Sequence, residues 1–135
     1  MDNKQQILCA WRRKYVRLTP EEHVRQSVLR ALEMHFGYPH GLIGVEIPIE
    51  VAGLKKRCDA IVYNRQMRPL MLVEFKAETV PLTQQVLDQA AIYNRRLHVP
   101  YLMLSNGKDT IVAEVLETTY RFQEQIPTYQ ALNAE

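Results

Sequence analysis

The sequence predicts an α/β domain in which a central mixed β-sheet is flanked by α-helices, in the order αβββαββ. Two segments carry helix start and stop signals, and five short runs rich in apolar residues are bounded by glycine, proline or polar turns. A chain of 135 residues with 47% hydrophobic and 24% charged content is ordinary for one compact domain. We therefore expect a single domain spanning residues 1–135, with the first fifteen residues and the tail after Tyr120 at its periphery.

The first helix is signalled by the stretch "LTPEEHVRQ". Thr19 is the expected N-cap, Pro20 occupies the first helical position, and Glu22 follows the cap by three residues, which is a capping-box arrangement. Gly37 and Pro39 are expected to end the helix. The positions predicted to face the core recur at helical spacing and are Val24, Val28, Ala31, Leu32 and His35.

Strands, a second helix and a hairpin are predicted to follow. The strands are residues 44–51, 57–64, 70–76, 101–105 and 110–117. The second helix, over residues 82–98, contains good helix formers and no glycine, with Pro81 before it and Pro100 after it. Asn106 and Gly107 predict a tight turn between the last two strands, because both residue types tolerate positive φ.

Asp59, Glu74 and Lys76 are charged residues in or beside two apolar strands. If Asn64 and Pro69 close the turn between these strands, antiparallel pairing places Asp59 opposite Glu74, and Lys76 points to the same face. Opposed carboxylates repel each other, so a cation is expected between them, and Mg²⁺ prefers such oxygen ligands. The alternative is a solvated strand end, where Glu and Lys two residues apart are commonplace.

The context of this acidic pair favours a functional site. Leu70 and Leu72 on one face, and Met71, Val73 and Phe75 on the other, are typical of a strand buried on both sides at the centre of a sheet. Charged residues that end such a strand need a partner. Beside a metal, Lys76 could orient or deprotonate a water and stabilise charge that builds on a phosphate.

From about Val16 to Lys108 the chain resembles the PD-(D/E)XK nuclease superfamily, and more closely the N-terminal domain of type I restriction enzyme R subunits. The resemblance rests on several motifs in order: "RLTPEEHVRQ", "GYPHGLIGVEIPIE", "KRCDAIVYN" followed by "LVEFKA", "QAAIYN" and "YLMLSNG". It implies a restriction-endonuclease-like core. It also implies that Asp59, Glu74 and Lys76 are the metal-binding and catalytic residues, with Mg²⁺ or Mn²⁺ as cofactor.

Further site residues are implied by the same resemblance. Glu22 matches an acidic residue that the first helix contributes to catalysis and metal binding, although its place in a capping box explains it without a metal. Gln89 and Tyr93 resemble a Q-x-x-x-Y element that approaches the catalytic site from the second helix. Their spacing also fits a solvated Gln beside a half-buried Tyr on one helical face.

The basic cluster Lys55, Lys56 and Arg57 is the candidate for nucleic-acid binding. Next to a nuclease site these side chains could hold phosphates, a contact that positions DNA without reading its sequence. Short basic clusters are also often merely solvated, and the formal net charge of +2 does not by itself argue for a polyanionic partner.

The function expected from the resemblance is that of a Mg²⁺-dependent endodeoxyribonuclease. The chain has no GxxxxGK[ST] phosphate loop and no length for an ATP-driven motor, so a separate motor or specificity subunit is a candidate partner besides DNA. The main rival is a non-catalytic or partner-dependent nucleic-acid-binding module, and a purely structural role comes third. No stretch reaches the roughly 20 apolar residues of a membrane helix, and no signal peptide is evident, so we expect a cytoplasmic protein.

Overall fold

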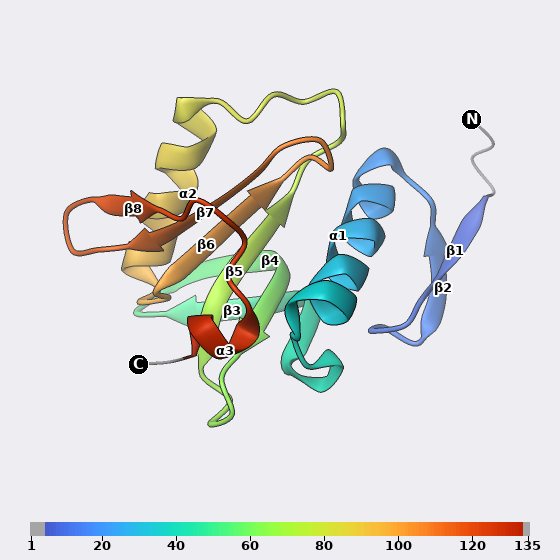
Figure 1. Ribbon diagram of the computed structural model, residues 1–135, viewed down its shortest axis with the longest axis horizontal. Coiled ribbons are helices and arrows are strands. Elements are labelled where there is room, and N and C mark those ends of the chain that lie inside the picture. The colour runs from blue at the N-terminus through green and yellow to red at the C-terminus, as the bar shows by residue number, and fades with distance from the viewer. Residues whose placement is uncertain (1–4, 134–135) are drawn as a thin grey trace.

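The computed structural model describes residues 5–133, and Figure 1 shows their arrangement. The helices are α1 (Pro20–Phe36), α2 (Gln84–Arg96) and the short α3 (Tyr129–Leu132), with a 3₁₀ turn, η1, at His40–Leu42. The strands are β1 (Gln6–Cys9), β2 (Lys14–Arg17), β3 (Ile43–Val51), β4 (Leu54–Tyr63), β5 (Pro69–Phe75), β6 (Tyr101–Ser105), β7 (Thr110–Val115) and β8 (Tyr120–Phe122). No helix in this part of the chain is long and apolar enough to cross a membrane.

Six strands form one mixed sheet in the order β3-β4-β5-β6-β7-β8. Only β5 and β6 run parallel, and α2 connects them, because a parallel pair needs a crossover connection. The pairs Ala60–Val73, Ile61–Leu72 and Val62–Met71 have the register predicted from the sequence. The mixed α/β architecture is therefore confirmed.

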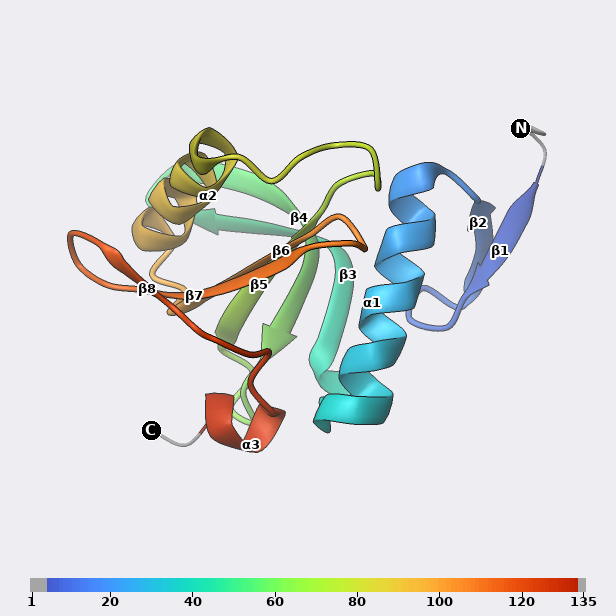
Figure 2. The same cartoon turned by 45° about the horizontal axis from the view of Figure 1, so that its top comes forward.

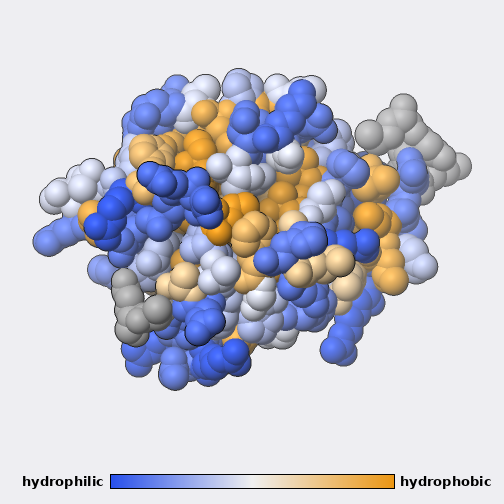
Figure 3. Space-filling view, viewed as in Figure 1, coloured by the Kyte–Doolittle hydropathy of each residue, from blue (hydrophilic) through white to orange (hydrophobic). Residues whose placement is uncertain are grey.

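Helices cover the sheet on two sides, as Figure 2 shows for α1 and α2. The main core lies under α1, whose Leu29 and Leu32 pack with residues of β5 such as Met71 and Val73. A second cluster joins α2 to the other side of β6. Strand β5 is buried on both faces, as predicted. In Figure 3, apolar residues gather in the middle of the visible face and hydrophilic residues surround them.

Helix α1 has the predicted ends, and Val24 and Leu32 are buried as predicted. The Oγ1 atom of Thr19 accepts a hydrogen bond from the N–H of Glu22 at 3.0 Å, and Gly37 ends the helix with a φ of 73°. The prediction that His35 faces the core is wrong, because this side chain is exposed. Polar residues at the start of the helix are buried instead: Glu22, Arg25 and Gln26.

Two regions contain structure that the sequence did not predict. Strands β1 and β2 form a hairpin beside α1, which Figures 1 and 2 both show. The tail after Tyr120 was expected to be peripheral, and this is wrong for its last part. Tyr129 and Leu132 are only 4% and 2% exposed and belong to the main core. Tyr129 also donates a hydrogen bond to the carbonyl oxygen of Tyr63 at 2.9 Å.

Candidate active site

The site forms where the regular alternation of side chains along β3 and β4 is interrupted. Beyond this point, the side chains of both strands point to the opposite face of the sheet. Glu46 has a φ of 58°, in the left-handed region, and neither Glu46 nor Asp59 takes part in the ladder. The residues on either side are paired as Val45–Ala60 and Ile47–Cys58. The first pair packs under α1 and the second packs on the α2 side, so Asp59 lies at the crossing point with a side chain that is 34% exposed.

Asp59 is fixed against the end of β5. Its Oδ2 atom accepts a hydrogen bond from the N–H of Phe75 at 2.8 Å, and its Oδ1 atom lies 4.0 Å from Nη2 of Arg25. Burial raises the pKa of Asp59, and the charges of Glu74 and Glu46 add to this, whereas the bond from Phe75 and the charge of Arg25 oppose it. The net shift is upward, so the ionised carboxylate lacks sufficient positive charge around it.

Glu74, at the end of β5, binds a lysine of the neighbouring strand. Its Oε1 atom lies 2.6 Å from Nζ of Lys56, and the two side chains are 17% and 19% exposed. The same ammonium group lies 4.8 Å from the ring centroid of Tyr93 on α2. Burial opposes ionisation of Lys56, but the hydrogen bond and charge of Glu74 outweigh it and raise the pKa of the lysine. Lys56 is therefore the cation already bound to one member of the acidic pair.

Lys76 follows β5 directly and is half-buried. Its backbone N–H donates to the carbonyl oxygen of Ser105 at 2.9 Å, which fixes the chain at this point. Its ammonium group forms no ion pair or hydrogen bond with any other residue in the described range 5–133. The side chain is thus available to a ligand at the end of β5.

Arg25 of α1 lies near Asp59 and also contacts two further carboxylates, those of Glu46 and Glu22. Its Nη2 atom lies 2.8 Å from Oε1 of Glu46, and its Nη1 atom lies 3.8 Å from Oε1 of Glu22. Burial alone would raise the pKa of Glu46, but the hydrogen bonds from Arg25 and Arg57 outweigh it and lower that pKa. Arg25 is only 6% exposed, so its charge acts in a poorly solvated environment.

Glu22 is committed to other residues. Its Oε2 atom accepts hydrogen bonds from Nη2 of Arg12 at 2.6 Å and from Nε2 of Gln26 at 2.7 Å. Within residues 5–133, no group of three or more His, Cys, Asp or Glu side chains is placed to hold a metal ion. The structure therefore brings Asp59 and Glu74 together, whereas Glu22 reaches them only through Arg25. Its role as a third metal ligand stays a prediction.

The donor set at Asp59 and Glu74 fits a hard divalent cation. Oδ1 of Asp59 and Oε2 of Glu74 accept no hydrogen bond from the described residues, so each carboxylate keeps one oxygen for a ligand. Mg²⁺ keeps several waters and needs only one or two protein carboxylates. The raised pKa of Asp59 shows that added positive charge would be favourable there.

Of the remaining predicted residues, Tyr93 contacts the site and the others lie on exposed surface around it. Tyr93 meets the site through Lys56, whereas Gln89 is exposed and forms no side-chain hydrogen bond within residues 5–133. Lys55 is exposed, and Arg57 is 74% exposed with its Nε atom 2.8 Å from Glu46. All three residues of the basic cluster line an open pocket of about 570 Å³, together with Pro48, Ile49 and Glu50.

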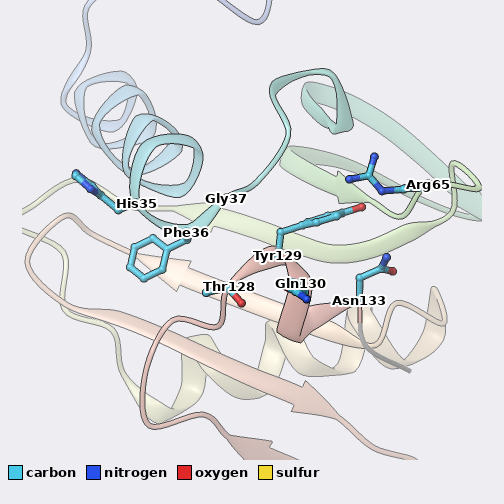
Figure 4. Close-up of a pocket in the computed structure, with 8 residues that line it drawn as sticks. All are labelled: His35, Phe36, Gly37, Arg65, Thr128, Tyr129, Gln130 and Asn133. Carbon is cyan, nitrogen blue, oxygen red and sulfur yellow. The ribbon is translucent and has the colours of Figure 1, made fainter.

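The sequence alone does not reveal the roles of Arg25 and Glu46, or the pairing of Lys56 with Glu74. Arg25 falls among good helix formers without a motif, and nothing in "GVEIPIE" indicates the left-handed backbone of Glu46. A larger pocket of about 740 Å³ lies elsewhere, between the end of α1, the β4–β5 turn and α3 (Figure 4). It contains none of the candidate residues.

Two solved structures resemble the chain. The fragment structure of "a putative HsdR subunit of a type I restriction enzyme" from Vibrio vulnificus YJ016 has a TM-score of 0.64 and 21% identity, and the match covers 85% of this chain and 24% of that one. "A putative nuclease belonging to DUF820" from Anabaena variabilis ATCC 29413 has a TM-score of 0.56 and 7% identity, and the match covers 90% of this chain and 81% of that one. Both support the restriction-endonuclease-like fold.

The chain spans about a quarter of the length of the Vibrio fragment. No curated protein matches it. The family described as "Type I restriction enzyme R protein N terminus" matches residues 20–127, which is most of the chain and includes α1, α2 and the strands that carry Asp59 and Glu74. The resemblance expected from the sequence motifs is thereby confirmed, and the chain belongs to the family of type I restriction enzyme R protein N-terminal domains.

Proposed function

We propose that the chain is a metal-dependent DNA endonuclease domain that hydrolyses phosphodiester bonds and holds Mg²⁺ or Mn²⁺ with Asp59 and Glu74. The observation that carries the proposal is the bond from the Phe75 N–H to Asp59, which fixes this carboxylate beside Glu74 at the end of a buried strand. Lys76, which forms no ion pair with another described residue, follows at the same strand end. Membership in the restriction-enzyme family supports the same reading.

The residues of the chain supply binding, orientation and charge. A bound Mg²⁺ would contribute Lewis-acid chemistry, polarising a phosphoryl oxygen and lowering the pKa of a water. Lys76, whose ammonium has no protein partner among the described residues, orients the attacking water and stabilises negative charge that develops on the phosphate. Lys55 and Arg57 are exposed at the adjacent pocket and contact phosphates of the DNA backbone.

The decisive experiment compares wild type with Lys76→Ala in cleavage of plasmid and oligonucleotide DNA, with and without Mg²⁺ or Mn²⁺. Cleavage should fall on the order of 100-fold or more, as when one donor to transition-state charge is removed, while Mn²⁺ binding in calorimetry is retained. Lys76→Arg should not rescue it, since guanidinium is bulkier and cannot act as a base. Lys108→Ala, on the exposed β6–β7 turn, is the matched control and should cut normally.

Two results would contradict the proposal. If wild type cuts no DNA form faster than Lys76→Ala, the isolated chain is not a nuclease. If Asp59→Ala binds Mn²⁺ as tightly as wild type, the metal is not held at the proposed carboxylates. The two measurements are independent, so failure of the cleavage step can be separated from failure of the metal site.

A second candidate is a non-catalytic or partner-dependent nucleic-acid-binding module on the same fold. One observation favours it: Lys56 already neutralises Glu74 at 2.6 Å, so a cation is present without any metal. Such a module should bind DNA equally well in chelator and cut nothing. In the partner-dependent form, a separate motor or specificity subunit completes the activity, in line with the type I restriction family to which the chain belongs.

A further inference from the structure

The β1–β2 hairpin, residues 6–17, carries a concentration of positive charge that the proposed site does not use. Within residues 5–20 the charged side chains are all basic, and there is no Asp or Glu. Arg13, Lys14 and Arg17 are exposed, and none of them forms an ion pair with another described residue. Tyr15, which is 65% exposed, lies on the strand between Lys14 and Arg17. The hairpin therefore presents to solvent three cations that no other described residue neutralises.

This hairpin is fixed to the body of the domain. Arg12, in its turn, donates from Nη2 to Oε2 of Glu22 at 2.6 Å. Trp11 stacks on His40 with ring centroids 4.7 Å apart. Cys9 is fully buried and its Sγ atom accepts hydrogen bonds from both the backbone N–H and Nε of Arg12 at 3.3 Å. The cations are therefore carried on a positioned element and not on a loose terminus.

A chain of ion pairs across the first turns of α1 links the hairpin to the candidate site. Glu22, which holds Arg12, also lies 3.8 Å from Arg25, and Arg25 lies 4.0 Å from Asp59. Figures 1 and 2 show the hairpin alongside α1, on the opposite side of this helix from the large sheet. Residues 6–17 precede the segment that matches the restriction-enzyme family, which begins at residue 20.

We infer that the β1–β2 hairpin is a DNA-binding arm whose Arg13, Lys14 and Arg17 contact backbone phosphates next to the candidate active site. The inference rests on the proposed function for the position of the DNA, and on charge complementarity for the choice of partner. Phosphate contacts of this kind provide affinity and register without sequence specificity. An acidic protein surface would meet the same cations, and it becomes an outcome of the test.

The test measures binding of a labelled DNA duplex in EDTA, where cleavage is blocked, over a range of salt concentrations. Arg13→Gln/Lys14→Gln is compared with Arg65→Gln/Arg68→Gln, which removes the same charge from the exposed β4–β5 turn. The logarithm of the DNA-binding constant falls with the logarithm of the salt concentration, and each phosphate contact contributes about −0.9 to this slope. The hairpin variant loses two contacts, so its slope should be less negative by about 1.8. At 0.1 M salt this corresponds to a loss of affinity of roughly 60-fold. The control should lose less than about 3-fold.

The thermal unfolding temperature and the Mn²⁺ affinity are measured for each variant, and both should match those of wild type. Equal losses in the two variants would show that net charge alone matters and would overturn the inference, as would unchanged DNA binding in the hairpin variant. Binding of the hairpin to an acidic protein but not to DNA would also overturn it. The hairpin variant could bind DNA as tightly as wild type and still show cleavage that depends on Lys76. This result would overturn the role of the hairpin in DNA binding and would leave the proposed nuclease function intact.

Discussion

Replacing Lys56 with methionine tests whether the ammonium group of this lysine neutralises Glu74 in place of a metal ion. Methionine keeps much of the aliphatic length but removes the ammonium that lies 2.6 Å from Glu74 and 4.8 Å from the Tyr93 ring centroid. Without metal, Glu74 is left 17% exposed and without its partner. A lost hydrogen bond between charged, partly buried groups costs about 1–3 kcal/mol of unfolding free energy.

With metal bound, Glu74 regains a positive partner, so the same substitution should cost only about 0–1 kcal/mol. The difference between the two costs equals the change in metal-binding free energy, because the four states form a closed cycle. Metal binding by Lys56→Met should therefore strengthen by about 1–2 kcal/mol, or roughly 5-fold to 30-fold in Kd.

The assay combines urea unfolding in chelator and in saturating Mn²⁺ with calorimetric titration of Mn²⁺. Lys55→Met is the matched control, since it removes the same charge from the neighbouring exposed position. The control should change stability by less than about 0.5 kcal/mol and leave Mn²⁺ affinity near that of wild type. Lys56→Met that binds Mn²⁺ no more tightly than wild type, or that keeps full stability in chelator, would refute the reasoning.

Three further predictions concern stability. Because the folded-state pKa of Asp59 lies above its ordinary value of 3.8, its contribution to stability is favourable below that pH and is lost as pH rises through the folded pKa. Asp59→Asn should therefore be more stable than wild type by up to about 1 kcal/mol near pH 7 without metal, with the gap closing in acid; a less stable variant in urea unfolding would contradict this. Arg25→Met should cost about 2–4 kcal/mol in the same measurement, because it leaves Glu46 and Asp59 without a buried counter-ion, whereas Arg30→Met on the exposed face should cost little. Leu132→Ala should lower stability by about 2–4 kcal/mol if the tail belongs to the core; a thermal scan within error of wild type would exclude that.

The sequence predicted those parts of the fold that follow from local rules. The register that pairs Ala60 with Val73 and Ile61 with Leu72 could be read because a short turn joins the two strands, although a bulge between Val62 and Tyr63 makes Tyr63, and not Asn64, the partner of Pro69. The α1 caps could be read because Thr19 and Gly37 act on their own helix ends. In both cases the information lies within a few residues.

The charged environment of the site could not be predicted in this way. Arg25 is polar and was not expected in a core, yet its burial depends on carboxylates that come from β3 and β4. Glu46 adopts a backbone conformation that its residue type does not favour, so tertiary contacts decide it. The sequence indicates a phosphate-binding role for Lys56, and only the folded sheet shows that its ammonium group lies against Glu74. These features arise from contacts between elements distant in sequence.

Every strand from β3 to β8 pairs with its neighbour in the chain, so most contacts within the sheet are local in sequence. Local pairings cost little loop-closure entropy, and we expect the β3–β4–β5 meander to form early in folding. Asp59 and Glu74 then meet while water still hydrates both charges, and their desolvation is completed only when the helices dock. The mutual repulsion of the two carboxylates should therefore shorten the lifetime of the folded state and leave the rate of its formation almost unchanged.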